Sequence, residues 1–176
     1  PLLTFKRGAV VHFAMSDSDI RMTTKLAGDA TFFLPFNRGN DGAAGNPPGD
    51  KGHYPVSYFW ERVLQKDNWL HIFHRFVLQE RKETQNAEGK TYFKEGLIFP
   101  RFHQWEAVTE IVAAVTEEGV GQRYLIQHSA GSGKTNTIAW TAHRLLSTYG
   151  VDEQRVFDSV IVVTDRTVLD DQLQEA

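Results

Sequence analysis

The sequence contains no cysteine among its 176 residues. Disulfide bonds, cysteine nucleophiles and zinc sites built on thiolates are therefore excluded. A chain without cysteine suits a reducing compartment, and we expect a cytoplasmic location.

Long apolar runs are also absent, and none reaches the roughly 20 residues that a helix needs to span a bilayer. We therefore expect no membrane partner. Residues 1–7 lack the apolar stretch and the small-residue cleavage site of a signal peptide. They also lack an initiator methionine, so we expect that the chain is cut from a longer one.

The sequence lacks an excess of either sign of charge, because its formal net charge is only -3. The hydrophobic fraction of 41% and the charged fraction of 23% are ordinary for a soluble globular protein. The balance of charge gives no sign of a nucleic-acid partner. A DNA motor uses a locally basic channel, however, so the net value does not exclude one.

The most informative stretch is residues 127–135, Gln-His-Ser-Ala-Gly-Ser-Gly-Lys-Thr. An apolar run precedes it and a helical pattern follows it, which is the context of a nucleotide phosphate loop. Glycine lets backbone N–H groups turn inward around an anion, and the next helix directs its positive end there. We expect the phosphates to contact Ser129, Ala130, Gly131, Ser132, Gly133, Lys134 and Thr135.

Two of these residues have specific predicted roles. Lys134 would reach the β- and γ-phosphates, and the Thr135 hydroxyl would ligate Mg²⁺. The motif departs from the strict pattern at one position, because His128 stands where a glycine is expected. The alternative is a glycine-rich turn that binds no ligand, but the glycines, the lysine and the threonine together favour a phosphate loop.

The second half of the chain alternates helical and apolar patterns. Helices are predicted from residue 101 to Gly119, after the phosphate loop and over residues 167–174; strands are predicted at residues 124–127 and 160–163. The helix after the loop has an apolar stripe of Ile138, Ala142, Leu145 and Tyr149. This alternation predicts an α/β fold with a parallel sheet that is covered on both faces.

The first half reads as a small α+β segment. Strands are predicted at residues 10–14, 20–24 and 31–34, and helices at residues 58–64 and 69–77, the second with Asp67 as its N-cap. Residues 37–54, rich in Gly, Asn, Asp and Pro, are predicted to form a long loop. The charged residues 79–94 suit either a surface linker or a mobile hairpin.

Several stretches resemble one known family. The second half resembles the first RecA-like motor domain of superfamily 2 translocases, and more narrowly the R (restriction and translocation) subunit of type I restriction–modification enzymes, the HsdR family. The matching stretches are residues 3–14, 22–28, 33–39, 45–48, 99–105, 124–136, 138–145 and 156–166. Histidine at the position of His128 is usual in this family.

The resemblance implies a domain organisation and a function. Residues 1–80 would end the nuclease region and connect it to the motor, residues 81–98 would be a linker, and residues 99–176 would begin a partial RecA-like domain. The parent protein would translocate and cut double-stranded DNA with ATP and Mg²⁺ as cofactors. Its partners would be the methylation and specificity subunits of the same system.

The resemblance also assigns residues. Gln104 aligns with the glutamine that reads adenine in helicases, and its amide offers both a donor and an acceptor. Thr164 and Arg166, on either side of Asp165, align with a motif that contacts the DNA backbone. The alternatives are a polar residue at a helix start for Gln104, and a helix cap with a surface arginine for the other two.

The family's catalytic carboxylates are missing from this stretch. The nuclease motif and the D-E-x-H box are expected before and after it, so the sequence predicts no catalytic residue here and an incomplete enzyme. Two other functions stay open. One is a nucleotide-binding module that does not hydrolyse ATP, and the other is a superfamily 2 DNA helicase unrelated to restriction.

Overall fold

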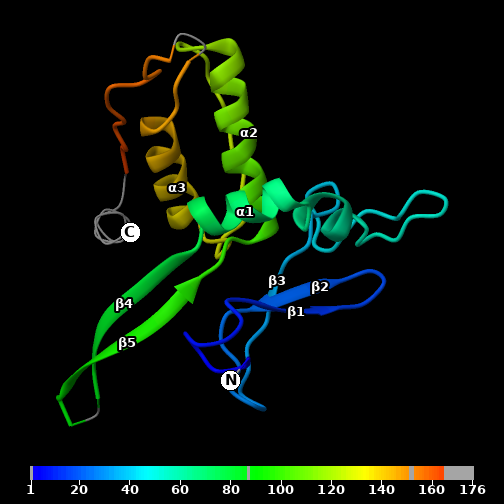
Figure 1. The fold of residues 1–176 in the computed structure, drawn as a ribbon, viewed down its shortest axis with the longest axis vertical. Helices are drawn as coiled ribbons and strands as arrows, with labels where there is room; N and C mark the ends of the chain where they lie inside the picture. The colour runs from blue at the N-terminus through cyan, green and yellow to red at the C-terminus, as the bar shows by residue number, and fades with distance from the viewer. Residues whose placement is uncertain (1, 87, 151–152, 165–176) are drawn as a thin grey trace. The chain divides into compact units, whose positions relative to one another are not determined.

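A computed structural model describes residues 2–86, 88–150 and 153–164 of the chain (Figure 1). The fold is mixed α/β with small antiparallel sheets. The chain divides into two compact units, Pro1–His103 and Gln104–Ala176, and each is described by itself. The assignment of residues 1–80, 81–98 and 99–176 to separate domains stays a prediction.

A three-stranded antiparallel sheet begins the first unit. Strand β1, His12–Met15, pairs with β2, Ile20–Thr23, in a register that places Phe13 opposite Met22. The turn between them is held by the Ser16 hydroxyl, which accepts a hydrogen bond from the Asp19 N–H at 3.0 Å. Both predicted strands and their hairpin connection are confirmed. An alternating apolar and polar pattern on both sides of a polar turn is a strong local signal for such a hairpin.

The third strand lies later in the chain than residues 31–34, where we predicted it. Strand β3 is only Leu34–Pro35 and pairs with β2. The Thr31 hydroxyl donates to the Gly28 carbonyl oxygen at 2.7 Å and accepts from the Ala27 N–H at 2.8 Å. This local turn prevents Thr31 from extending, because the hydroxyl competes for backbone groups that a strand would use.

Aromatic side chains form the core of the first unit. The rings of Phe13 and Phe36 contact each other, and each also contacts Phe59 and Phe99, with centroids 4.8 to 6.3 Å apart. Most of these contacts are edge-to-face, the arrangement that the ring quadrupole favours. The buried Tyr58 hydroxyl donates to the Phe36 carbonyl oxygen at 2.7 Å, and burial raises the pKa of Tyr58. The core therefore joins segments that are distant in sequence.

Residues 37–54 form a loop without a helix or strand, as predicted. Its first half is clipped to the β1–β2 turn by two asparagines. The Asn37 Oδ1 atom accepts from the Ile20 N–H at 2.9 Å and from Asn46 Nδ2 at 2.9 Å. The Asn37 Nδ2 atom donates to Asp19 Oδ1 at 2.6 Å, and Asn46 Nδ2 donates to the Ser18 carbonyl oxygen at 2.9 Å.

The hydrogen bond between Asn37 and Asp19 should make the stability of the fold depend on pH. The hydrogen bond from Asn37, together with Arg21, lowers the pKa of Asp19 below its ordinary value of 3.8. The resulting stabilisation is present above pH 3.8 and is lost as the pH falls through the lowered pKa. We expect Asp19→Asn to reduce the acid sensitivity of the free energy of unfolding, measured by urea denaturation at neutral pH and at several values below 3.8. Asp17→Asn, on the same turn, is the control and should retain the wild-type pH dependence.

Two short helices follow the loop. A π-helical turn, η1, spans Phe59–Val63, and α1 spans Lys66–Arg75. Both were predicted, but the N-cap of α1 is Gln65 and Asp67 lies in the first turn. The predicted cap is therefore wrong by two residues. A carboxylate in the first turn still interacts favourably with the positive end of the helix, which explains why the pattern resembled a cap.

A long hairpin ends the first unit. Strand β4, Leu78–Gln85, pairs along its whole length with β5, Thr91–Ile98. Of the two structures left open for this charged segment, the chain adopts the hairpin (Figure 1). The Asn86 Oδ1 atom closes the turn by accepting from the Glu88 N–H at 3.0 Å and the Lys90 N–H at 2.8 Å.

The second unit contains two helices of the predicted kind. Helix α2 is Phe102–Glu118 and α3 is Lys134–Leu146. Gly119 ends α2 with φ of 76° and an N–H bond to the Val115 carbonyl oxygen at 3.0 Å. This is the left-handed glycine stop that the sequence predicted. The helix predicted at residues 167–174 lies outside the described residues. Within the part of the chain that is described, no helix is both long and apolar enough to cross a bilayer.

The predicted parallel sheet is absent from residues 2–86, 88–150 and 153–164. Residues 124–127 and 160–163 are neither strand nor helix, and the exposed fractions of Leu125, Ile161 and Val163 are 92%, 85% and 88%. A parallel strand exists only where a neighbour accepts and donates its ladder hydrogen bonds. The apolar composition indicated a tendency to be buried, but it does not supply a pairing partner.

The predicted apolar stripe of α3 is wrong at Ile138 and Tyr149, whereas its other two members, Ala142 and Leu145, are half-buried. Ile138 and Tyr149 are 37% and 51% exposed, whereas Thr137, Ala139 and Trp140 are buried. Trp140 is the largest apolar side chain of the helix, and its burial removes more apolar area from water than burial of Ile138 would. The helix is therefore rotated to bury the tryptophan.

Candidate nucleotide-binding site

The predicted phosphate loop is a tight turn that ends at the start of α3. Gly131 and Gly133 have φ of 71° and 81°, in the left-handed region that favours glycine. The Ser132 N–H approaches the Ser129 carbonyl oxygen at 3.4 Å, and Gly133 is the N-cap of α3. The two glycines that the motif singled out are therefore the two residues at which the backbone turns.

The Lys134 side chain folds back across this turn. Its Nζ atom donates to the Ser129 carbonyl oxygen at 2.8 Å and approaches the His128 carbonyl oxygen at 3.4 Å. The residue is exposed, so these bonds compete with water. The ammonium group thus lies beside the backbone of the loop, where phosphate oxygens could replace the two carbonyl oxygens as acceptors.

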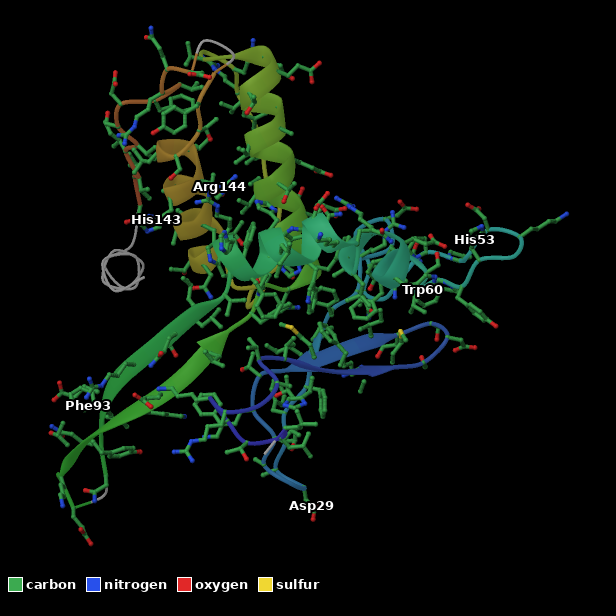
Figure 2. All side chains as sticks on the ribbon, in the orientation of Figure 1. Asp29, His53, Trp60, Phe93, His143 and Arg144 are labelled. Atoms are coloured by element: carbon green, nitrogen blue, oxygen red, sulfur yellow. The ribbon has the colours of Figure 1, made fainter. Side chains whose placement is uncertain are left out.

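The charge distribution along α3 favours an anion at its N-terminal end. The first turn contains no acidic residue, and no side chain caps the helix at Gly133. The last turn contains His143 and Arg144, which Figure 2 labels on α3. Basic groups at the C-terminal end stabilise the helix dipole, and the uncapped N-terminal end attracts negative charge.

Gln104 is in direct contact with the loop. It lies on α2, is only 3% exposed, and its Nε2 atom donates to the Gly133 carbonyl oxygen at 2.8 Å. A Cβ atom added at Gly133 would lie 2.6 Å from this same nitrogen. The structure therefore brings Gln104 and the phosphate loop together. The predicted adenine contact of Gln104 stays a prediction.

Sequence reasoning missed Thr137. This residue is 3% exposed, and its N–H and Oγ1 groups approach the Gly133 carbonyl oxygen at 3.3 and 3.4 Å. With Gln104, three groups therefore converge on one carbonyl oxygen. A threonine four residues after the N-cap glycine was the available signal, because a hydroxyl at that spacing lies over the carbonyl group one turn earlier.

Thr135 is the predicted Mg²⁺ ligand. It lies in the first turn of α3, next to Lys134, and is half-buried. A hydroxyl oxygen is a suitable ligand for a hard cation, and Mg²⁺ is usually held by few protein oxygens together with substrate phosphates and water. The described residues contain no group of three or more His, Cys, Asp or Glu that could hold a metal. The single Thr135 hydroxyl would fit an ion that takes its other ligands from phosphates and water.

Two residues, Thr164 and Arg166, are predicted to contact DNA. Thr164 is half-buried and belongs to no helix or strand. Arg166 lies outside the described residues. Their assignment to the DNA backbone stays a prediction.

Parts of this chain are similar to known proteins. Residues 103–176 match the SWI2/SNF2 ATPase family. The endonuclease subunit of the type I restriction enzyme HindI from Haemophilus influenzae is 31% identical over 115 residues, which are 63% of this chain and 10% of that protein. The chain therefore spans about a tenth of the length of this relative. No solved structure is a significant match.

Proposed function

We propose that this chain binds the phosphates of ATP through residues 129–135. The chain is a distant relative of the HindI endonuclease subunit and has a SWI2/SNF2 ATPase region at residues 103–176. The observation that carries the proposal is the position of Lys134. Its ammonium group lies across a turn formed by two left-handed glycines, at the uncapped N-terminus of α3.

The residues of the loop contact different parts of a bound triphosphate. Lys134 exchanges the Ser129 carbonyl oxygen for oxygens of the β- and γ-phosphates, where its charge offsets theirs. The N–H groups at the start of α3 donate to the same phosphates. The Thr135 hydroxyl ligates Mg²⁺, which when bound neutralises phosphate charge. These interactions position the nucleotide and need no covalent chemistry from the loop.

Gln104 reads the base in this proposal. Its side-chain amide matches the donor and acceptor at the adenine edge, and guanine reverses that pattern. In the structure its Nε2 atom donates to the Gly133 carbonyl oxygen. Any contact of this nitrogen with adenine therefore exchanges or shares that bond, so base recognition and the shape of the loop are coupled.

The whole protein would use this site to drive movement along DNA. We propose that it is the ATP-dependent, DNA-translocating and DNA-cleaving subunit of a type I restriction–modification system in the cytoplasm. Double-stranded DNA and the methylation and specificity subunits would be its partners. Thr164 and Arg166 would contact the DNA backbone with a hydroxyl group and a guanidinium group.

A second candidate is nucleotide binding without hydrolysis by this chain. It is favoured by the absence of any acidic residue in the first turn of α3 and of a metal-binding carboxylate cluster in the described residues. Hydrolysis requires a group that orients water and further charges that stabilise the transition state. A phosphate loop alone supplies neither.

We therefore expect the 176-residue chain to bind ATP in a Mg²⁺-dependent manner and to release no phosphate above background. Binding is measured by fluorescence titration with a labelled ATP analogue, with unlabelled ATP, GTP and pyrophosphate as competitors. Phosphate release is measured with and without duplex DNA. Absence of binding at millimolar ATP would contradict the assignment of the loop. Steady phosphate release that requires Lys134 would contradict the second candidate.

A further inference from the structure

We propose that one face of the β4–β5 hairpin binds the phosphate backbone of duplex DNA. The proposal rests on the proposed function, in which the chain belongs to a protein that moves along DNA. It is carried by different residues, however, because the hairpin lies in the first unit and the phosphate loop lies in the second.

The hairpin extends beyond the part of the first unit that holds it. At its base, the Thr24 hydroxyl donates to the Leu97 carbonyl oxygen at 2.8 Å, and Lys6 pairs with Glu95 at 2.6 Å. From Arg81 to Gln85 and from Thr91 to Glu95, every residue except the half-buried Thr84 is exposed. A two-stranded ribbon is at best marginally stable without packing. This outer half therefore contributes little to the core.

The strand register sorts the charges of this outer half onto two faces. Lys82 lies directly opposite Lys94, and Tyr92, which is 48% exposed, is the next residue of β5 on the same face. The only acidic residue of either strand on this face is Glu80, nearer the base, which pairs with Lys82 at 2.8 Å. Such an exposed ion pair is weak and is readily exchanged.

The opposite face carries both signs of charge. The Arg81 guanidinium stacks on the Phe93 ring at 3.9 Å from its centroid, and Phe93 is labelled on the hairpin in Figure 2. Glu83 and Glu95 lie on this face as well, and Lys6 neutralises Glu95. A polyanion would therefore meet carboxylates on this face, whereas the face with Lys82 and Lys94 is the basic one.

The pairing of Lys82 with Lys94 points to a ligand. Like charges directly opposite each other destabilise an antiparallel pair. Lys94 has no ion-pair partner in the part of the chain that the structure describes, and both lysines are exposed. Glu80 offsets part of this repulsion by its pair with Lys82, and an anion between the two ammonium groups would offset the rest. Successive phosphates of a nucleic acid would also offer an acceptor to the Tyr92 hydroxyl.

Duplex DNA fits this surface better than a single strand does. A two-stranded β-ribbon has a width that the major groove of B-DNA admits. Asn86 Oδ1 accepts two backbone hydrogen bonds at the end of β4, from Glu88 and Lys90. Single-strand binders stack successive bases on several aromatic rings, whereas Tyr92 is the one aromatic residue on the basic face of β4 and β5.

The test measures binding of a short fluorescein-labelled duplex of arbitrary sequence to the full chain without nucleotide, by anisotropy over a range of salt concentrations. We expect Lys82→Gln with Lys94→Gln to weaken binding roughly tenfold at low salt and to reduce the slope of log K against log salt by about 1.8, which is 0.9 for each phosphate contact. The matched control, Lys51→Gln with Lys66→Gln, makes the same change in net charge elsewhere on the first unit. It should leave the affinity and the slope within experimental error of the wild type.

Two further variants separate binding from folding. Lys82→Arg with Lys94→Arg keeps both charges and should retain the affinity. The glutamine pair removes a repulsion, so its thermal midpoint should not fall below that of the wild type. A glutamine pair that binds duplex as the wild type does would overturn the proposal. So would an equal loss in the control pair, no duplex binding by the wild type at low salt, or a loss confined to single-stranded DNA.

The same assay distinguishes the two proposals from each other. If the chain binds no ATP but the hairpin variants lose duplex affinity, then the assignment of the phosphate loop fails and the hairpin surface stands. If ATP binds but the hairpin variants are unaffected, then the hairpin surface alone is wrong.

Discussion

Replacing Lys134 with alanine should weaken the binding of Mg²⁺-ATP by about 10- to 150-fold, which corresponds to about 1.5–3 kcal/mol for hydrogen bonds to a charged group. The ammonium group lies at the N-terminus of α3 and already bridges to the Ser129 carbonyl oxygen at 2.8 Å. The variant loses both the positive charge and the group that spans the loop. In the DNA-translocating protein that we propose above, we expect the same variant to abolish ATP-driven movement.

The structure offers a matched control for this variant. Lys66 is the first residue of α1, just as Lys134 is the first residue of α3. Lys66→Ala therefore makes the same change of charge and helix propensity at a helix start that has no phosphate loop. Its ATP affinity should equal that of the wild type. Both variants should keep the wild-type circular dichroism spectrum, because both lysines are exposed. Wild-type affinity of a folded Lys134→Ala would show that the loop does not bind phosphate.

The second large effect is expected at Gly133. Gly131 and Gly133 both have positive φ, so alanine at either position costs about 1–2 kcal/mol of backbone strain. Only at Gly133 would the new Cβ atom meet another group, at 2.6 Å from Gln104 Nε2. Nothing lies within 4 Å of a Cβ atom at Gly131. The Gln104 amide is the end of a side chain and can move aside, so the added cost is mainly the loss of its hydrogen bond to the Gly133 carbonyl oxygen. We therefore expect Gly133→Ala to lower the free energy of unfolding and the ATP affinity by more than Gly131→Ala does, by about the 0.5–1.5 kcal/mol of one hydrogen bond.

A double variant isolates the contribution of the contact. Gln104→Ala removes the amide that the new methyl group would strike, at the expense of a hydrogen bond worth about 0.5–1.5 kcal/mol. If the new methyl group strikes the amide, the double variant Gln104→Ala with Gly133→Ala should lose less free energy of unfolding than the two single variants lose together. The measurement is urea denaturation of all four proteins with ATP titrations in parallel. Strict additivity would mean that Gln104 and Gly133 do not interact in solution.

Local signals in the sequence predicted the elements that local chemistry determines. Gly119 stops α2 because of its own backbone, and the polar turn of the β1–β2 hairpin is closed by the neighbouring Ser16. The glycine turn before α3 belongs to the same class, because Gly131 and Gly133 themselves adopt positive φ; its role in binding phosphate stays a prediction. In each case the residues that carry the signal also make the contact.

The sequence-based predictions are wrong where a residue distant in the chain, or a competing hydrogen-bonding group, determines the local structure. Thr31 uses its hydroxyl group in a turn, and the third strand is displaced as a result. Residues 124–127 and 160–163 have the composition of buried strands, but pairing depends on neighbours that composition does not specify. The contact between Gln104 and Gly133 joins residues 29 positions apart. No periodicity in one sequence specifies a contact of that kind.

The hydrogen bonds of Asn37 and Asn46 divide the loop of residues 37–54 into two shorter loops, each closed by its own contacts. Its first part is closed by Asn37 and Asn46 against the β1–β2 turn. Its second part is closed where Gly49 passes so near the His53 carbonyl oxygen that a Cβ atom would lie 2.0 Å from it. Because the entropy of closure grows only slowly with length, two short closures restrict the chain more than one long closure does. The contacts that close the second part are separate from those that tie the first part to the sheet, so we expect the two parts to lose their structure separately.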